Sequence, residues 1–200
     1  MMKQYQDLIS KESPKLQGVA FDWRQQTFQE YQANAKEDDK FHFICSLNSI
    51  YYLGDVEKSV KSLYDKLENG GLLLITLAGG WGGLGKLLSH LQTLGIKDGS
   101  LTSFDVERAC KKHNIPVPEI QTIKLRCDIS LCFDPPDQLS KDGNTLLDFL
   151  THTVNFAQNA PPEYREDVLR LMKSEPCSER GSAGEVIFDA SNAAVIIRRQ

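Results

Sequence analysis

Several features that would fix a function are scarce in this chain of 200 residues. Its five cysteines are an odd number without a CxxC pair, and its four histidines have no ligand-like spacing to one another or to the cysteines. We therefore expect no disulfide framework and no metal site, but free thiols in a reducing cytoplasm. No apolar run approaches the length that crosses a bilayer, and residues 1–15 lack the apolar centre of a signal peptide, so no membrane partner is expected.

Basic residues are not in excess either. The 23 Lys and Arg against 27 Asp and Glu give a net charge of -4, which argues against nucleic acid as a partner. The hydrophobic fraction of 40% with mixed charges is typical of a folded globular protein. The length suits a single domain with a real core, which we predict over residues 1–200.

The most informative stretch is Phe41 to Asp55, which reads FHFICSLNSIYYLGD. Its apolar run at 43–45 predicts a strand covered on both faces, as in a parallel sheet. Ligands of such sheets lie just beyond the carboxyl ends of the strands, so Asn48, Tyr51 and Tyr52 are the first site candidates. The residues alone leave open that both tyrosines are ordinary half-buried side chains.

Helices and strands alternate along the rest of the chain, which predicts an α/β fold. Strands are expected at 19–23, 72–77, 120–125, 129–133, 185–188 and 193–197, the last two forming an antiparallel hairpin around Asp189 to Asn192. Helices are expected at 3–12, 27–35, 55–67 (ended by Asn69-Gly70-Gly71), 86–94, 102–113 and 146–156, with another starting at Pro161-Pro162.

The run Gly80-Trp81-Gly82-Gly83-Leu84-Gly85 matches GxGxxG between a strand and a helix. In a dinucleotide site an acidic residue ends the next strand, but Asp98 follows no β-like run. We therefore interpret the glycines as a flexible loop at the rim of a pocket. A dinucleotide-dependent oxidoreductase depends on this pattern alone and is a distant third hypothesis.

Two other sets of residues have plain structural interpretations. Asp189 and Asn192 suit a turn, and Phe149 suits a core. No Ser-His-Asp, Cys-His or paired-carboxylate arrangement is supported.

Longer segments resemble a known family. The pattern Phe43-Ile44 followed by Tyr51-Tyr52, CDISLCF at 127–133, LLDFLTHTVNFAQNAPPEYRED at 146–167 and GEVIFDASNAAVII near the C-terminus together resemble histamine N-methyltransferases. The likeness runs through nearly the whole chain in order. It implies the class I S-adenosylmethionine-dependent methyltransferase fold, with a mostly parallel Rossmann-like sheet of strand order 3-2-1-4-5-7-6. It also implies methylation of a ring nitrogen of histamine.

The resemblance assigns roles to particular residues. Leu47 and Phe28 fall on cofactor contacts, although Phe28 stands where the family has a small polar residue. Asn48 stands where the family commonly has Gln. The family's C-terminal Asn, which binds the histamine amine, aligns with Ala190, and Asp189 or Asn192 can substitute for it. The acceptor pocket is thus expected to comprise Asn48, Tyr51, Tyr52, Phe149 and Asp189.

By the same alignment the segment at Val19 is the third strand, so the first two strands and their glycine-rich cofactor loop are absent. The fourth strand should then present a bare edge. Two functions follow from the resemblance. The first is a methyltransferase for a small amine, represented by an incomplete chain. The second is a cofactor-free, inactive homologue that acts by binding; neither interpretation fixes the oligomeric state.

Overall fold

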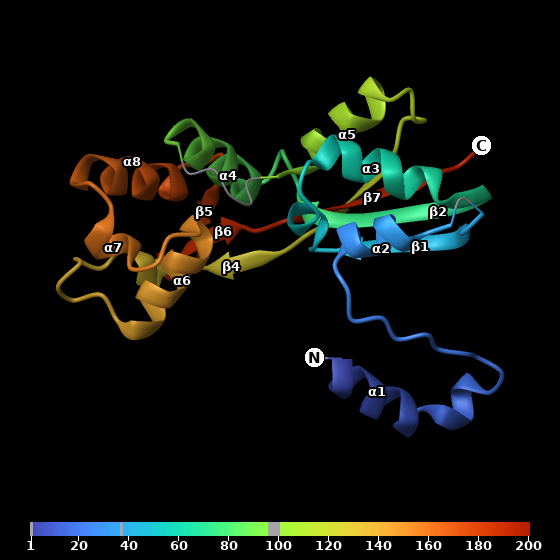
Figure 1. The fold of residues 1–200 in the computed structure, drawn as a ribbon. Helices are drawn as coiled ribbons and strands as arrows, with labels where there is room; N and C mark the ends of the chain where they lie inside the picture. The colour runs from blue at the N-terminus through green and yellow to red at the C-terminus, as the bar shows by residue number, and fades with distance from the viewer. Residues whose placement is uncertain (1, 37, 96–100) are drawn as a thin grey trace. The chain divides into compact units, whose positions relative to one another are not determined.

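The computed structural model describes residues 2–36, 38–95 and 101–200 (Figure 1). Asp98, the acidic residue considered for a dinucleotide site, lies outside this set. The chain divides into two compact units, Met1–Asp39 and Lys40–Gln200, and a single domain over 1–200 stays a prediction. None of the described helices is long and apolar enough to cross a membrane.

The first unit contains helix α1 (Met2–Lys11), a 3₁₀ turn (Ser13–Leu16) and helix α2 (Phe28–Asn34). Thr27 and Glu30 form a reciprocal capping box that starts α2. The strand expected at 19–23 is wrong. These residues belong to no β-ladder in the described structure, and Phe21 and Trp23 instead stack on each other with ring centroids 5.7 Å apart. An apolar segment becomes a strand only where a neighbouring strand satisfies its backbone groups.

The second unit is built on a four-stranded sheet of order β1-β2-β7-β3. β1 is parallel to β2, whereas β7 is antiparallel to both β2 and β3. This is the 4-5-7-6 half of the expected order, so that part of the fold prediction is confirmed. The strands are β1 (Phe41–Leu47), β2 (Leu67–Ala78), β3 (Glu119–Ile123) and β7 (Asn192–Arg198).

The core of this sheet comes from alternate residues of its two central strands. Leu73, Ile75 and Leu77 of β2 are at most 1% exposed, and Val195 and Ile197 of β7 are fully buried. Helices α3 (Val56–Asp65) and α5 (Ser103–Lys112) lie side by side over one face of the sheet (Figure 1). The sheet is therefore firmly packed on the side of these two helices.

β1 is the edge strand of this sheet, as the resemblance implied. It pairs with β2, and no described strand pairs with its other edge. Phe43 and Leu47 are 56% and 57% exposed. The expectation that this strand is covered on both faces is therefore wrong, because side chains at both of these positions are more than half exposed.

Helix α3 starts where the sequence predicts but ends earlier. The Asp55 side chain accepts a hydrogen bond from the Lys58 amide at 3.0 Å and caps the first turn. The last helical residue is Asp65, and Gly70, with a φ of +78°, lies in an irregular start of β2 rather than at the helix end. Gly70 thus has the predicted left-handed backbone, but it lies in strand β2 and does not end the helix.

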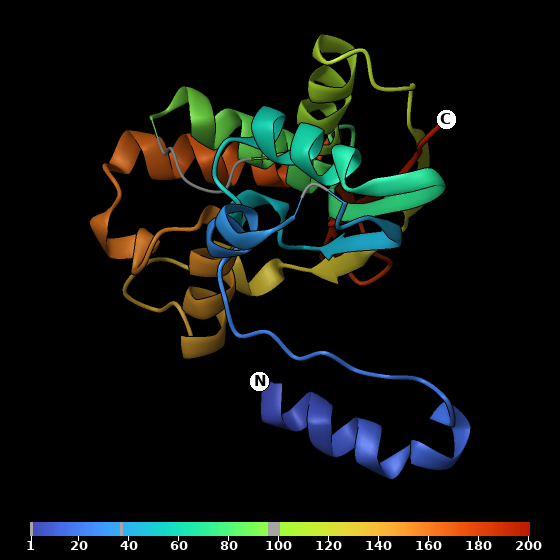
Figure 2. The same ribbon diagram turned by 45° about the vertical axis from the view of Figure 1, so that its right-hand side comes forward.

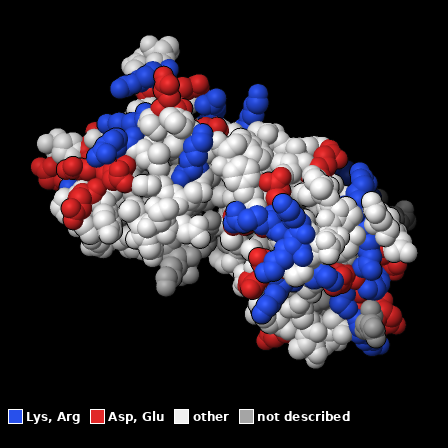
Figure 3. Space-filling view, turned by 90° about the horizontal axis from the view of Figure 1, so that it is seen from above, with Lys and Arg blue, Asp and Glu red and all other residues white. Residues whose placement is uncertain are grey.

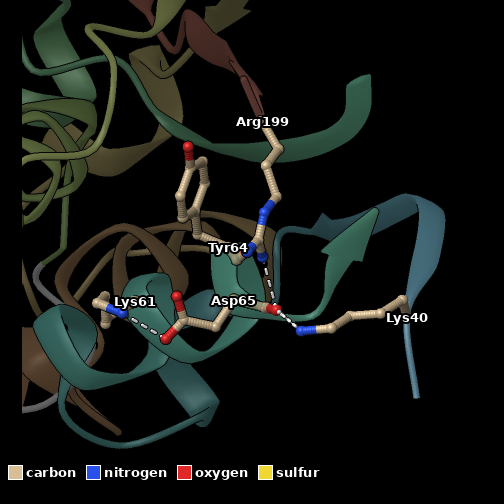
Figure 4. Close-up of polar contacts among 5 residues, drawn as sticks. All are labelled: Lys40, Lys61, Tyr64, Asp65 and Arg199. Atoms are coloured by element: carbon tan, nitrogen blue, oxygen red, sulfur yellow. Dashed lines mark hydrogen bonds and ion pairs between the residues drawn. The ribbon is translucent and has the colours of Figure 1, made fainter. Parts of the chain in front are cut away.

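Cations surround the C-terminal end of α3 (Figure 4). The Arg199 guanidinium donates to the carbonyls of Tyr64 (3.1 Å) and Asp65 (2.7 Å), and Lys40 Nζ donates to the Asp65 carbonyl at 2.6 Å. Lys61 forms an ion pair with the Asp65 carboxylate. Positive charge at a helix C-terminus satisfies the last carbonyls and opposes the helix dipole, so these contacts tie the chain end to α3.

A second, three-stranded antiparallel sheet has the order β4-β6-β5. The predicted C-terminal hairpin is wrong: its two segments are strands, but β6 pairs with β4 and β5, whereas β7 belongs to the first sheet. The chain crosses between sheets at Ala190–Ser191, because each segment finds partners from elsewhere in the sequence. The strands are β4 (Arg126–Asp128), β5 (Ser178–Arg180) and β6 (Val186–Asp189).

Helices lie around this second sheet (Figure 2), and their buried side chains form a core that includes Phe156 and Phe188. The strand expected at 129–133 is instead the 3₁₀ turn Ser130–Phe133. The helix expected at 146–156 begins earlier and ends at Thr151, which leaves Val154 77% exposed rather than inward. The helices are α4 (Gly83–Thr93), α6 (Lys141–Thr151), α7 (Phe156–Asn159) and α8 (Pro162–Lys173).

The charged side chains of the face carrying α3 and α5 are mixed in sign (Figure 3). Glu57 of α3 and Lys112 of α5 form an ion pair across the two helices. Neighbouring charges of opposite sign cancel at a distance, so this face presents no broad field of one sign.

Candidate functional site

A pocket of about 870 Å³ opens where β1 and β2 end and β7 begins. This is the carboxyl edge of the two parallel strands, the place where open α/β sheets bind ligands. Its described lining residues are Asn48, Tyr51, Tyr52, Gly54, Ala78, Leu84, Leu88, Leu101, Asp148, Phe149, His152 and Asn192. Four of the five predicted acceptor residues are therefore brought together: Asn48, Tyr51, Tyr52 and Phe149.

Asn48 directly follows β1 and adopts a left-handed backbone with a φ of 45°. Its amide donates to the backbone carbonyl (2.9 Å) and to the hydroxyl (3.1 Å) of Thr76 on β2. Left-handed backbone costs free energy in a residue other than glycine, and Asn tolerates it better than most. The contacts to Thr76 hold the backbone in place, while the exposed side-chain amide lines the pocket.

Tyr51 and Tyr52 lie on the 3₁₀ turn Ile50–Tyr52 and form an aromatic wall. Their ring centroids are 4.6 Å apart and the planes meet at 63°, an edge-to-face pair. Tyr52 is 78% exposed, which contradicts the half-buried structural interpretation for this ring. Burial, and then the neighbouring Tyr52, raise the pKa of Tyr51, so its phenol is a hydrogen-bonding group rather than a base at neutral pH.

The C-terminal turn of α6 supplies another part of the lining through Asp148, Phe149 and His152. Phe149 is 70% exposed, so the core interpretation is wrong for this ring. The Asp148 carboxylate accepts the amides of Asn155 (2.7 Å) and Phe156 (2.9 Å), which fixes the chain after the helix. Asp148 and His152 were missed; helical spacing would have placed only His152, three residues on, beside Phe149, because adjacent residues such as Asp148 and Phe149 do not share a helix face.

Of the two C-terminal candidates for binding the amine, Asp189 and Asn192, one lines the pocket and the other does not. Asn192 lines the pocket, whereas Asp189 is not among its described lining residues. Burial opposes ionisation of Asp189, but hydrogen bonds from Ser191 and Gly83 and the charge of Arg126 outweigh it and lower the pKa of the carboxyl. Asp189 thus stabilises the crossing between the sheets, and its role in acceptor binding stays a prediction.

The two predicted cofactor residues lie outside this lining. Leu47 is 57% exposed at the end of β1, and Phe28 begins α2 in the Met1–Asp39 unit. Their roles as cofactor contacts stay predictions.

The glycine-rich run is tightly packed instead of open. A Cβ on Gly83 would lie 2.4 Å from the Cys177 carbonyl oxygen, and one on Gly85 would lie 2.2 Å from that of Gly79. The Gly80 amide already donates to the Ser103 hydroxyl at 3.1 Å. A phosphate cradle needs amides that point at the ligand, whereas these glycines permit close backbone contact.

Among the described residues, neither the thiols nor the carboxylates gather into a metal site. The described residues contain no group of three His, Cys, Asp or Glu that could hold a metal ion. Burial raises the pKa of Cys132 to about 12 and that of Cys110 to about 11, so neither thiol is a ready nucleophile.

Comparisons with known proteins agree with this arrangement. The chain is 33% identical over 201 residues to histamine N-methyltransferase A of Xenopus laevis, covering 96% of this chain and 66% of the relative. It is 32% identical over 205 residues to histamine N-methyltransferase of Xenopus tropicalis (98% and 67%), and 31% identical over 199 residues to carnosine N-methyltransferase 2 of Gallus gallus (96% and 60%). The chain thus spans about two thirds of the length of these relatives.

Solved structures show the same fold. A provisionally assigned methyltransferase of Bacillus halodurans superposes with a TM-score of 0.50 at 12% identity, over 99% of this chain and 78% of that protein. The YcgJ protein of Bacillus subtilis gives a TM-score of 0.50 at 15% identity, over 100% and 79%. No family model matches the sequence. With the class I methyltransferase strand order and relatives above 30% identity along nearly its whole length, the chain belongs to the histamine N-methyltransferase family.

Proposed function

We propose that this chain forms the acceptor side of a cytoplasmic, S-adenosylmethionine-dependent N-methyltransferase for a small amine such as histamine, which it methylates at an imidazole nitrogen. One observation carries this proposal: Asn48, Tyr51, Tyr52 and Phe149, which come from two distant segments, line one pocket. The relatives named for histamine and carnosine methylation support an imidazole-bearing acceptor.

The pocket suits an imidazole ring. Tyr51, Tyr52 and Phe149 offer aromatic faces and edges to a flat ring, and the Asn48 amide can hydrogen-bond one ring nitrogen. Fixing the ring in one orientation leaves the other nitrogen directed at the methyl donor. A neutral imidazole nitrogen already has a free lone pair, so no strong general base is required. Tyr51, with its raised pKa, is consistent with an orienting role.

The described residues fit the acceptor more completely than the cofactor. When bound, S-adenosylmethionine supplies a methyl group on a positively charged sulfur. The aromatic wall of Tyr51 and Tyr52 can border that charge. Leu47, by contrast, is an exposed residue at the end of the edge strand β1, and the glycine-rich run packs against backbone. We expect cofactor affinity to be the limiting property of this chain.

This imbalance favours a second candidate function, a cofactor-free homologue that binds a small amine without turning it over. The exposed β1 edge and the position of Leu47 outside the pocket lining are the observations for it.

Calorimetric titration with S-adenosylmethionine, run beside a thermal melt, separates the two. Micromolar binding supports the methyltransferase and should raise the melting temperature by about 5–10 °C at a hundred times the Kd. A cooperative melt without any heat of binding supports the cofactor-free homologue.

A further inference from the structure

Residues 48–53 connect strand β1 to the start of helix α3 and carry Asn48, Tyr51 and Tyr52 of the pocket lining. Connecting segments open locally at a low free energy unless side chains hold them. Ile50 is fully buried, so its packing fixes the middle of this segment. The positions of the two tyrosine rings then depend on how the ends of their turn are held.

The residue before the turn, Ser49, is held by a hydroxyl from β1. The Ser46 Oγ and Ser49 Oγ atoms lie 3.0 Å apart, within hydrogen-bond distance. Ser46 is only 6% exposed, whereas Ser49 is half-buried. A buried hydroxyl without a partner costs free energy, so Ser46 favours the position of Ser49 that keeps this bond.

The residue after the turn, Leu53, is held by a hydroxyl from α3. The Ser59 hydroxyl is 4% exposed and donates to the Leu53 carbonyl at 3.1 Å. Serine hydroxyls within helices commonly bond the carbonyl four residues back, as Ser89 does to Gly85 at 2.9 Å. Ser59 instead bonds six residues back, to a residue outside its helix, and so connects α3 to the turn.

We propose that Ser46 and Ser59 are positioning residues whose hydroxyls fix the two ends of the turn and thereby hold the rings of Tyr51 and Tyr52 at the acceptor. Neither serine is among the described lining residues, so each acts through the turn. The effect on catalysis rests on the proposed function, because a displaced aromatic wall misaligns the acceptor with the methyl donor. If the packing of Ile50 alone holds the turn, both hydroxyls are merely paired core groups.

Hydrogen exchange, measured amide by amide with NMR, tests the proposal without any ligand. The Tyr52 and Leu53 amides donate to the carbonyls that begin the turn, at 3.0 and 3.1 Å. Ser46→Ala or Ser59→Ala should make both amides exchange about five- to tenfold faster, the factor that one lost hydrogen bond contributes. The amide of Asn159, in the exposed one-turn helix α7, should exchange within about twofold of its wild-type rate.

Matched variants at two other serines assign the effect to these bonds. Ser89→Ala removes a hydroxyl that bonds within α4, so it should leave the Tyr52 and Leu53 amides within about twofold. Ser49→Thr keeps a hydroxyl for Ser46 and should retain wild-type exchange, whereas Ser49→Ala should match Ser46→Ala. The double variant Ser46→Ala/Ser49→Ala should exchange no faster than either single variant, because both changes remove the same bond.

Wild-type exchange of the turn amides in folded Ser46→Ala and Ser59→Ala chains overturns the proposal. An equal acceleration at Asn159 overturns it too, because the loss is then global. If Ser46→Ala does not fold, the comparison of Ser49→Ala with Ser49→Thr decides, since Ser49 is only half-buried.

Methyl transfer from S-adenosylmethionine to histamine measures the consequence for catalysis. In an active chain, Ser49→Ala should lower kcat about tenfold without changing the affinity for S-adenosylmethionine, and Ser49→Thr should restore the wild-type kcat. Faster exchange of the turn with a wild-type kcat overturns the positioning role. A wild-type chain that transfers no methyl group contradicts the proposed function, and exchange of the turn amides then decides this inference by itself.

Discussion

Replacing Gly83 by Ala tests whether the glycine-rich run is a packing device. A Cβ at this position would lie 2.4 Å from the Cys177 carbonyl oxygen and 2.9 Å from the Asp189 carbonyl oxygen. Both obstacles are backbone, from the segments that enter and leave the second sheet, so neither can move as a side chain would. Overpacking should lower the free energy of unfolding by about 3 kcal/mol, and the higher helix propensity of Ala should offset about 1 kcal/mol of that loss. The net loss is therefore about 2 kcal/mol.

The adjacent Gly82 provides the matched control. Its Cβ would lie 3.5 Å from the nearest atoms, which is ordinary contact, and its φ of -74° suits any residue. Gly82→Ala should cost less than about 1 kcal/mol through weaker capping. For a chain of this length, differential scanning calorimetry should place the Gly83→Ala melt about 4–8 °C below wild type and the Gly82→Ala melt at most about 3 °C below it. A Gly83→Ala variant that melts with wild type would show that the loop is open, as a phosphate-binding loop is.

Three further perturbations test the supports of the site. Arg199→Ala should lower the free energy of unfolding, measured by urea titration, by about 1–2 kcal/mol, because carbonyls at the end of α3 lose a charged donor. Arg198 is exposed and makes no such bonds, so Arg198→Ala should lower the same free energy by less than about 0.5 kcal/mol. Phe188→Ala should cost about 3–5 kcal/mol, since this ring is fully buried in the second core; a loss under about 1 would mean that this core is not formed. The pKa of Asp189 is lower in the folded chain than its unfolded value near 3.8, so its ionisation stabilises the fold above that pH, and this stability is lost as pH falls through the folded pKa. Asp189→Asn should therefore make the melting temperature fall less steeply below about pH 4. An unchanged slope would contradict this.

Local patterns predicted the elements whose signal lies within their own residues. The apolar run at 72–77 indicated a buried strand, and the caps at Asp55 and Thr102 start helices where they were expected. Strand pairing was less predictable because it depends on residues far along the chain. The segments at 185–188 and 193–197 look like a hairpin locally, yet each finds its partners in a different sheet.

The site was predicted from the family resemblance more than from the residues. Asn48 and the two tyrosines follow a strand and were candidates on position alone, whereas Phe149 required the resemblance. Asp148 and His152 were missed, because the helix was expected to continue to residue 156 and its end could not be placed at the pocket. Helix α6 is followed by His152, which has a left-handed backbone, and the Asp148 carboxylate holds the next turn by accepting the Asn155 amide.

The central claim, that this pocket orients an amine for methyl transfer, is tested most directly by following a labelled methyl group from S-adenosylmethionine to histamine. Wild-type chain should yield ring-methylated product above the protein-free background. Asn48→Ala should reduce the rate about 10²-fold, because an unoriented ring loses the alignment that the pocket provides. A folded chain that binds both ligands but transfers no methyl group, or an Asn48→Ala variant with the wild-type rate, would contradict the claim.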